Sequence, residues 1–433
     1  MSKYLLFFLI LAAFNPLYGQ ENLRLQDAVE FGLENNYGIK IARENENISA
    51  NNYTIGNAGF LPLVGVNASK NYSVENTRQE FIENRLQERD GAKSERFAAD
   101  VGLQWTIFDG MGMFITYDKL AELKEAGNLN VKVVIENTIA DISAAFYQVV
   151  LAKERLNVLQ NTLDLSRERR TISKTKYEVG KASKLEFLAA QVDYNADTSA
   201  LITQRETLYN AKTDLNRLMG RNPAETFEVT SIIELGRDLE LDSLIETAML
   251  NNPSYQLLRK EKNIAMLEIK EIQAERLPQL NLNAGYLYNT SSAEAGFLVS
   301  RRSYGPTYGI SANMPIFDGF NLNRRVQNAR IQSEIAEMGI QDFQLELETE
   351  IRKTHMNYLN NLTLIGLEKQ NLEVARENTE IALERYRLGN SDALELREAQ
   401  LNSAAAESRL LNATFITKLS EIELLRLSGR IMD

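Results

Sequence analysis

The sequence contains two related copies of one unit, and this internal duplication limits the folds that the chain can adopt. The Leu-Pro-Leu motif at 61–63 returns as Leu-Pro-Gln at 277–279, 216 positions later, and the Ile-Phe-Asp-Gly motif at 107–110 returns unchanged at 316–319, 209 positions later. One loop is therefore seven residues shorter in the second copy. A unit of about 200 residues is a duplicated domain rather than a solenoid repeat of roughly 20–50 residues. We predict a first structural repeat at 20–236 and a second at 237–433, which together form one protomer.

The first 19 residues have the pattern of a secretory signal peptide. Lys3 supplies a positive charge, residues 4–14 form an apolar run, and Pro16 and Gly19 interrupt that run before a polar segment. This order is typical of a sequence that is cleaved on export. A retained membrane anchor is the less favoured alternative, because the run is shorter than the ~20 residues that span a bilayer. We predict a signal peptide at 1–19 and an exported mature chain.

The composition removes several classes of function. The chain has no cysteine and a single histidine, His355, which excludes thiolate chemistry and multi-histidine metal sites, so we expect no metal and no cofactor. The formal net charge is -11, whereas nucleic-acid-binding proteins usually carry an excess of basic residues, so the composition argues against nucleic-acid binding. Beyond the signal peptide no apolar stretch approaches the ~20 residues of a spanning helix. If the protein crosses a bilayer, strands must do it.

Two long segments without proline predict long helices. All seven prolines lie outside 111–219 and 321–433, and proline is excluded from helix interiors. Asp109 and Asp318, just before these segments, are expected to cap them. In each segment two apolar stripes follow a seven-residue step and lie about 200° apart around the helix. In the second segment they are Ile351, Tyr358, Ile365, Leu372 and Tyr386 on one side, and Leu367, Val374, Ile381 and Leu388 on the other. A helix with apolar stripes on two opposite sides packs against a neighbouring helix on each side. We therefore expect the helices to form the wall of a hollow cylinder.

Each helical segment contains one turn. Gly180 and Gly389 can take the left-handed conformation that ends a helix. Ser183 and Asp392 can then cap the helix that follows. Both repeats are therefore expected to form a helical hairpin.

Four further segments alternate apolar and polar residues with the period of two that is typical of strands. Their apolar members are Val64, Val66, Ala68, Tyr72 and Val74; Phe97, Ala99, Val101, Leu103, Trp105 and Ile107; Leu280, Leu282, Ala284, Tyr286 and Tyr288; and Tyr304, Tyr308, Ile310 and Met314. Leu287, on a polar face, is the exception. The charged segment 75–96 is expected to be an external loop.

An apolar outer face with a polar inner face is typical of a transmembrane β-barrel with a watery lumen. A half-buried soluble sheet is the alternative. Known barrels start at about eight strands, so four strands cannot close one and several chains must pool their strands.

The order of these features resembles the TolC-like outer-membrane efflux proteins over essentially the whole mature chain. The resemblance rests on the duplication, the Leu-Pro junctions at 61–62 and 277–278, the Phe-Asp-Gly turns at 108–110 and 317–319, and the Tyr-x-x-Gly hairpin tips. It implies a mostly α fold with a membrane β-barrel part. Duplicated long helical hairpins would form a periplasmic α-barrel, and four strands per chain would contribute to a trimeric twelve-stranded outer-membrane β-barrel.

The same resemblance implies a function, a place and partners. The protein would be the outer-membrane exit duct of a tripartite efflux or type I secretion system, and it would conduct substrates passively and not act as an enzyme. It would lie in the bacterial outer membrane, in contact with outer-membrane lipid, and extend into the periplasm. The implied partners are two further copies in a homotrimer, a periplasmic adaptor (membrane fusion) protein and an inner-membrane transporter. The hairpin tips would contact the adaptor through Gly180, Lys181, Ala182, Ser183, Gly389, Asn390, Ser391 and Asp392.

Four residues match the periplasmic gate of that family: Tyr386, Glu395, Glu398 and Glu186. Ser391 occupies the position of the family's locking arginine, which argues against the salt-bridge form of that lock. Glu186 and Glu395 lie three residues after the predicted caps, so participation in a capping box is the alternative for these two. Glu398 has no capping role and is the better gate candidate.

Two other classes of protein compete with this interpretation. A periplasmic adaptor or coiled-coil scaffold also uses helical hairpins, but it lacks four amphipathic strands repeated by duplication. An exported enzyme would depend on paired carboxylates, the chemistry that remains without cysteine. The acidic residues of this chain flank the heptad stripes, which favours solvated surface positions.

Overall fold

The computed structural model describes residues 21–82, 85–230, 232–236 and 239–432, so the predicted signal peptide at 1–19 lies outside it. The two halves of the chain contain the same succession of two helices, two strands and two long helices. The first half consists of α1 (Leu25–Asn35), α2 (Tyr37–Asn52), β2 (Leu63–Glu80), β3 (Leu86–Asp109), α3 (Gly112–Glu178) and α4 (Lys184–Met219). The second half consists of α5 (Leu241–Asn251), α6 (Pro253–Ala274), β5 (Gln279–Ala293), β6 (Ser300–Asn313), α7 (Asn321–Leu388) and α8 (Ala393–Leu427). Two short strands, β1 (Glu21–Leu23) and β4 (Phe227–Val229), complete the elements.

The described residues fall into two compact units. The first contains residues up to 41 together with 133–252 and 346–433, and the second contains 42–132 and 253–345. Both predicted repeats contribute to both units, and the repeat boundaries stay a prediction.

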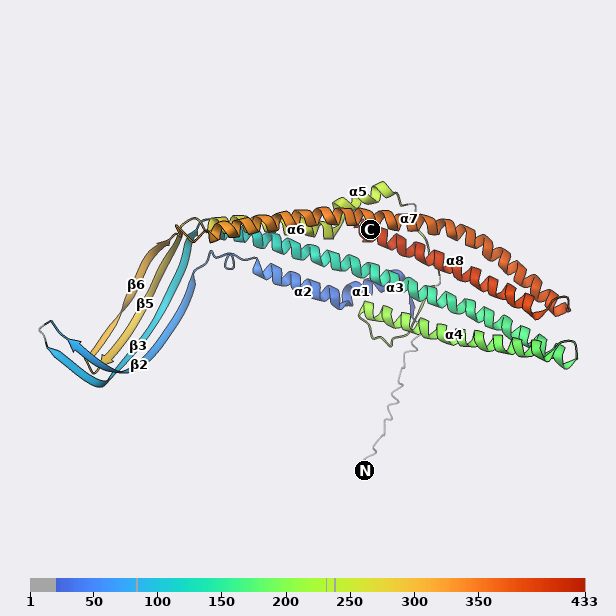
Figure 1. Ribbon diagram of the computed structural model, residues 1–433, viewed down its shortest axis with the longest axis horizontal. Helices are drawn as coiled ribbons and strands as arrows, with labels where there is room; N and C mark the ends of the chain where they lie inside the picture. The colour runs from blue at the N-terminus through green and yellow to red at the C-terminus, as the bar shows by residue number, and fades with distance from the viewer. Residues whose placement is uncertain (1–20, 83–84, 231, 237–238, 433) are drawn as a thin grey trace, which may run out of the picture. The chain divides into compact units, whose positions relative to one another are not determined.

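The two predicted helical hairpins are α3–α4 and α7–α8. The first unit contains both turns, which lie at the same end of these helices (Figure 1), while the first parts of α3 and α7, up to residues 132 and 345, belong to the second unit. Gly180 and Gly389 have φ angles of 75° and 82°, the left-handed conformation that ends a helix. Ser183 Oγ accepts a hydrogen bond from the backbone of Glu186, and Asp392 caps α8 through Oδ1. The predicted hairpins and both of these caps are confirmed.

The core of the first unit lies where α1, α3 and α4 meet a parallel pair of short strands. β1 pairs with β4, and Leu23, Phe227 and Val229 are at most 2% exposed. They pack with Ile142 of α3 and Leu215 of α4 in one apolar cluster. The segment that links the two repeats is therefore anchored in this core.

The two apolar seams of α7 have different environments. The residues of the first seam are buried within the first unit, with exposed fractions of 0% for Ile351, 1% for Tyr358, 7% for Ile365, 7% for Leu372 and 0% for Tyr386. The residues of the opposite seam are exposed: 52% for Leu367, 66% for Val374, 52% for Ile381 and 73% for Leu388. Among the described residues, the chain supplies a neighbour for only one of the two seams.

A buried polar network joins α8 to the α3–α4 hairpin. Both terminal nitrogens of Arg397 donate to the carboxylate of Asp197, at 2.8 and 3.0 Å. Ser166 Oγ donates to the same carboxylate, and Gln400 Nε2 donates to Ser166 Oγ at 2.7 Å. Ser166 and Gln400 are at most 2% exposed. Three helices therefore share one ionic network in a region with little water.

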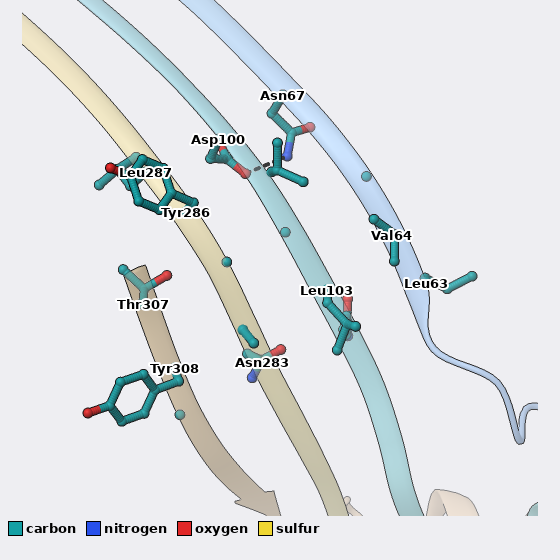
Figure 2. Close-up of a pocket in the computed structure, with 17 residues that line it drawn as sticks. Leu63, Val64, Asn67, Asp100, Leu103, Asn283, Tyr286, Leu287, Thr307 and Tyr308 are labelled. Atoms are coloured by element: carbon teal, nitrogen blue, oxygen red, sulfur yellow. Dashed lines mark hydrogen bonds between the residues drawn. The ribbon is translucent and has the colours of Figure 1, made fainter. Parts of the chain in front are cut away.

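The second unit contains an antiparallel four-stranded sheet in the order β2-β3-β5-β6 (Figure 1). Residues directly opposite one another in such a sheet point to the same face. The apolar residues match in register across all four strands, in the rows Val64–Leu103–Ala284–Tyr308, Val66–Val101–Tyr286–Pro306 and Ala68–Ala99–Tyr288–Tyr304. The opposite face carries Asn67, Asp100, Asn283 and Thr307, with Leu287 as its apolar exception (Figure 2). The predicted alternation of faces is confirmed.

The strands are longer than the sequence pattern indicates. The segment 75–96, predicted to be an external loop, continues the ladder: β2 runs to Glu80 and β3 starts at Leu86. Both faces are polar here, so the alternation that reveals a strand is absent. Backbone pairing and cross-strand ion pairs, such as Arg78 with Glu88 at 3.0 Å, accompany this extension.

Within the described residues one helix, α3, has a stretch that is long and apolar enough to cross a membrane, whereas the sequence indicated none. Of this stretch 56% is buried inside the protein, as in the core helices of soluble domains.

The buried network predicts a large effect of Asp197→Ala. The substitution removes the carboxylate that binds both terminal nitrogens of Arg397, whose side chain is only 15% exposed, and leaves only the more distant Asp193, at 3.9 Å, as its ion-pair partner. Removing one partner of a buried pair costs about 3–5 kcal/mol. Hydrogen exchange should therefore accelerate in α8, and the thermal midpoint in detergent should fall. Asp164→Ala is the control, because the Asp164–Arg167 pair is half exposed and contributes at most about 1 kcal/mol. Equal exchange rates in the two variants would contradict this role of the network.

Candidate functional site

The first unit brings Tyr386 and Glu186 together next to the two hairpin turns. The Tyr386 hydroxyl donates to Glu186 Oε1 at 2.9 Å, which joins the end of α7 to the start of α4. Lys176 Nζ donates to the carbonyl oxygen of Tyr386 at 2.6 Å and lies 3.8 Å from the centre of its ring. The ring is fully buried in a cluster with Leu396 and Ala399 of α8. Two of the four predicted gate residues therefore form one contact between the hairpins.

The environment of Tyr386 keeps its hydroxyl protonated. Burial, with the hydrogen bond to the Glu186 carboxylate as the second cause, raises the pKa of Tyr386 to about 12. A raised pKa means that the neutral donor is retained and is lost only as the pH climbs toward that value. The Tyr386 hydroxyl therefore remains a hydrogen-bond donor throughout the physiological pH range.

Glu395 binds residues of its own hairpin. Its Oε1 accepts from Arg385 at 2.8 Å and its Oε2 accepts from Ser391 Oγ at 2.8 Å. Ser391, which stands where the resemblance places an arginine, thus contributes a hydroxyl, and Arg385 supplies the positive charge. Sequence reasoning missed both Arg385 and Lys176, although each is the basic residue one turn from a tip.

Glu398 has a different environment. Its side chain is exposed on the next turn of α8, and no hydrogen bond or ion pair joins it to another residue of the described chain. Its carboxylate is therefore free to face a channel or a partner.

The capping-box alternative fails for Glu186 and Glu395. A capping box needs the glutamate carboxylate to accept from the backbone N–H of the N-cap. In the described chain these carboxylates bind Tyr386, Arg385 and Ser391 instead. Side chains of α7 reach these carboxylates: the Tyr386 hydroxyl binds Glu186, and the Arg385 guanidinium binds Glu395 through a charge-assisted hydrogen bond.

The two predicted aspartate caps differ from one another. Asp318 Oδ2 accepts from the backbone N–H of Leu322 in the first turn of α7, which confirms its role. Asp109 is the last residue of β3, and its Oδ1 is buried without a hydrogen-bond partner in the described structure, so the prediction for Asp109 is wrong. The ladder with β5 holds the backbone of Asp109 and keeps it out of the cap.

The two tips present similar surfaces. The predicted tip residues are exposed except Ala182 and Ser391, which are half-buried. Each tip also exposes a leucine at the second position of the helix that follows: Leu185 is 77% exposed and Leu394 is 73% exposed. These leucines add apolar area to two otherwise polar turns.

The described residues contain no group of three His, Cys, Asp or Glu side chains that could hold a metal ion. His355 Nε2 lies 2.8 Å from the carbonyl oxygen of Leu239, so this half-buried ring has a structural hydrogen bond.

Comparison with known proteins agrees with this architecture. The sequence profile of the family described as outer membrane efflux protein matches residues 32–221 and 244–430. The alkaline protease secretion protein AprF of Pseudomonas aeruginosa is 21% identical over 346 residues, which are 77% of this chain and 69% of that protein. The outer membrane protein TolC of Vibrio cholerae is 19% identical over 301 residues, 69% of this chain and 69% of that protein.

Solved structures show the same fold. The CmeC outer membrane channel of Campylobacter jejuni superposes with a TM-score of 0.80 at 18% identity, covering 94% of this chain and 86% of that one. The fold is thus that of the TolC-like channels, with a helical barrel and a β-barrel. The family match extends over most of both repeats, and the chain belongs to the outer membrane efflux protein family, whose members are channels of the outer membrane.

Proposed function

We propose that three copies of the chain assemble into one outer-membrane exit duct of a tripartite efflux or type I secretion system. The observation that carries this proposal is the pair of free sheet edges. β2 and β6 each have a single neighbour among the described strands. Lipid offers no hydrogen bonds to an open edge, so the edges must pair with other chains. Three sheets of four strands would give twelve, above the minimum of about eight for a closed barrel.

The exposed seam of α7 supports the same assembly. Leu367, Val374 and Ile381 lie on a seven-residue step and are more than half exposed. A coiled-coil seam of this kind needs a facing helix. A second copy of the chain is the partner that the duplicated, symmetric architecture favours.

The Tyr386–Glu186 contact is proposed as the latch of a periplasmic gate. It ties α7 to α4 by one hydrogen bond to a carboxylate, and hydrogen bonds to charged groups contribute about 1.5–3 kcal/mol. A partner that binds all three copies could therefore break the three symmetric hydrogen bonds with part of its binding free energy. Glu398, and to a lesser degree Glu395, would line the closed entrance.

The hairpin tips are proposed as the docking site for a periplasmic adaptor protein, which would connect the duct to an inner-membrane transporter. The tips are exposed, duplicated and carry Leu185 and Leu394. Transport through the duct would be passive, since the pump supplies the energy and this chain would not act as an enzyme.

The assembly predicts that charges in the α7 seam prevent trimer formation. Leu367→Glu with Val374→Glu removes apolar contacts that contribute about 1.5–3 kcal/mol for each buried side chain. Native mass measurement in detergent should then show monomers. Lys369→Glu changes the net charge by the same amount at an exposed position between them and should leave the trimer intact. A trimeric double variant would contradict the proposed seam.

The gate proposal predicts unequal effects of the two tip carboxylates. Glu398→Gln should weaken cation selectivity and block by divalent cations in planar bilayers, by about a factor of two or more, because a ring of free carboxylates attracts cations. Glu395→Gln should have the smaller effect, since Arg385 already offsets that charge. If both variants keep wild-type selectivity and block, the constriction lies elsewhere.

The docking proposal predicts that distortion of the tips abolishes efflux. Gly180→Val and Gly389→Val force a β-branched side chain into a left-handed conformation, while insertion into the outer membrane should be retained. Gly59→Val is the control, because Gly59 has a φ of 94° and equally open surroundings far from any hairpin turn in sequence. Normal efflux by both tip variants would remove the docking assignment.

A further inference from the structure

The polar face of the sheet carries two arginines in a single row. Arg96 of β3 lies directly opposite Ser291 of β5, which lies directly opposite Arg301 of β6. Asn71 of β2 completes the row. The two arginines are two strands apart, about 10 Å, and both are exposed. No ion pair or hydrogen bond joins either guanidinium to another residue of the described chain.

The rows on either side are uncharged. Toward the helices the next row of the same face is Ser69, Ala98, Asn289 and Ser303, and toward the hairpin turns it is Ser73, Ser94 and Ala293. On this face of the described sheet, the arginines are therefore the only charges in a band three rows deep.

The nearest acidic groups of this face are too distant to neutralise them. Asp100 and Glu75 each lie four residues along a strand from the row, about 13 Å. That exceeds the Debye length of about 8 Å at physiological ionic strength. Asp100 also accepts a hydrogen bond from Asn67 at 3.1 Å (Figure 2). Glu95 points to the opposite face, where it pairs with Lys70 at 2.7 Å.

The row lies at the outer end of the β5–β6 hairpin, whereas the β2–β3 hairpin extends farther, to Glu80 and Leu86. Arg301 is the second residue of β6, next to the β5–β6 turn, whereas the other ends of the strands lead into α2, α3, α6 and α7. In a duct whose helices extend into the periplasm, the hairpin turns are at the exterior. The arginines are therefore on the last stretch of the lumen before the exit.

We infer that Arg96 and Arg301 form an anion-binding collar in the lumen near the exit, which binds the carboxylate or phosphate groups of passing cargo. The inference rests on the proposed function, because it takes the polar face to line the lumen. A trimer would carry six guanidinium groups, one on every second strand. Rings of arginine select anions in pores, and the planar fork of each guanidinium can donate two parallel hydrogen bonds to one carboxylate or phosphate. Serine and asparagine side chains of the neighbouring rows add neutral donors.

The sheet supplies a matched control. Lys70 and Arg302 belong to the adjacent row, Lys70–Phe97–Thr290–Arg302, which points to the opposite, apolar face. A double glutamine variant at Lys70 and Arg302 removes the same charge at nearly the same height, but outside the lumen.

The test is block of single-channel current by inorganic tripolyphosphate, added in turn to each side of a planar bilayer that contains the full-length protein. Wild type should be blocked. Arg96→Gln with Arg301→Gln should raise the half-blocking concentration by about tenfold or more, as expected when charge-assisted hydrogen bonds are lost. Lys70→Gln with Arg302→Gln should stay close to wild type. Arg96→Lys with Arg301→Lys keeps the charge and should keep the block, which separates a loss of charge from misfolding.

Two results would overturn the collar in different ways. A conducting wild-type channel that tripolyphosphate does not block, or equal block of the two glutamine double variants, would overturn the collar and leave the proposed duct standing. Absence of any conductance, both in the wild-type protein and in a Tyr386→Phe variant that lacks the latch hydrogen bond, would overturn the duct itself, and the collar with it.

Discussion

The pairing of backbone groups at the sheet edges is the constraint on which the rest of this protein depends. A sheet with an apolar outer face belongs in lipid, and lipid leaves no hydrogen-bond partner for an open edge. The chain pairs β2 with β3, β3 with β5 and β5 with β6, and it leaves β2 and β6 open on one side. A single copy is thus chemically incomplete. We propose that other copies of the chain close the sheet, with the apolar rows facing outward and the polar face inward.

The first unit, which contains the hairpin turns, also has an apolar surface without a neighbour in the described chain. One seam of α7 is buried within the chain, and the opposite seam is exposed. The polar contacts within the unit are of two strengths. Asp197 and Arg397 form a buried, bidentate pair that holds α8 in place, whereas Tyr386 and Glu186 share one hydrogen bond at the tips. The bidentate pair is the stronger of the two contacts, and we propose that the single hydrogen bond is the one that a partner breaks.

Sequence reasoning succeeded where a pattern is local and failed where competition between partners decides. The glycine turns, the caps at Ser183 and Asp392, and the alternation of the strands follow from the conformational preferences of neighbouring residues. The continuation of β2 and β3 through 75–96 was missed, because a strand that is polar on both faces shows no alternation. The pairing of β1 with β4 was also missed, since three-residue strands about 200 positions apart leave no periodic signal. Asp109 was misassigned because the ladder with β5 holds its backbone.

The sequence by itself determined the duplication, the two helical hairpins, the two faces of the alternating parts of β2, β3, β5 and β6, and the export signal pattern. Apart from the duplication, these features depend on residues close together in the chain. Only the tertiary structure decided that Glu395 binds Arg385 and Ser391 while Glu398 stays free, and that Glu186 meets Tyr386 200 positions away. It also decided that Arg96 and Arg301 share one row of the polar face. The physical reason is register: a shift of one residue in strand pairing would turn each arginine to the other face, and local sequence does not fix a register between strands that are so far apart in the chain.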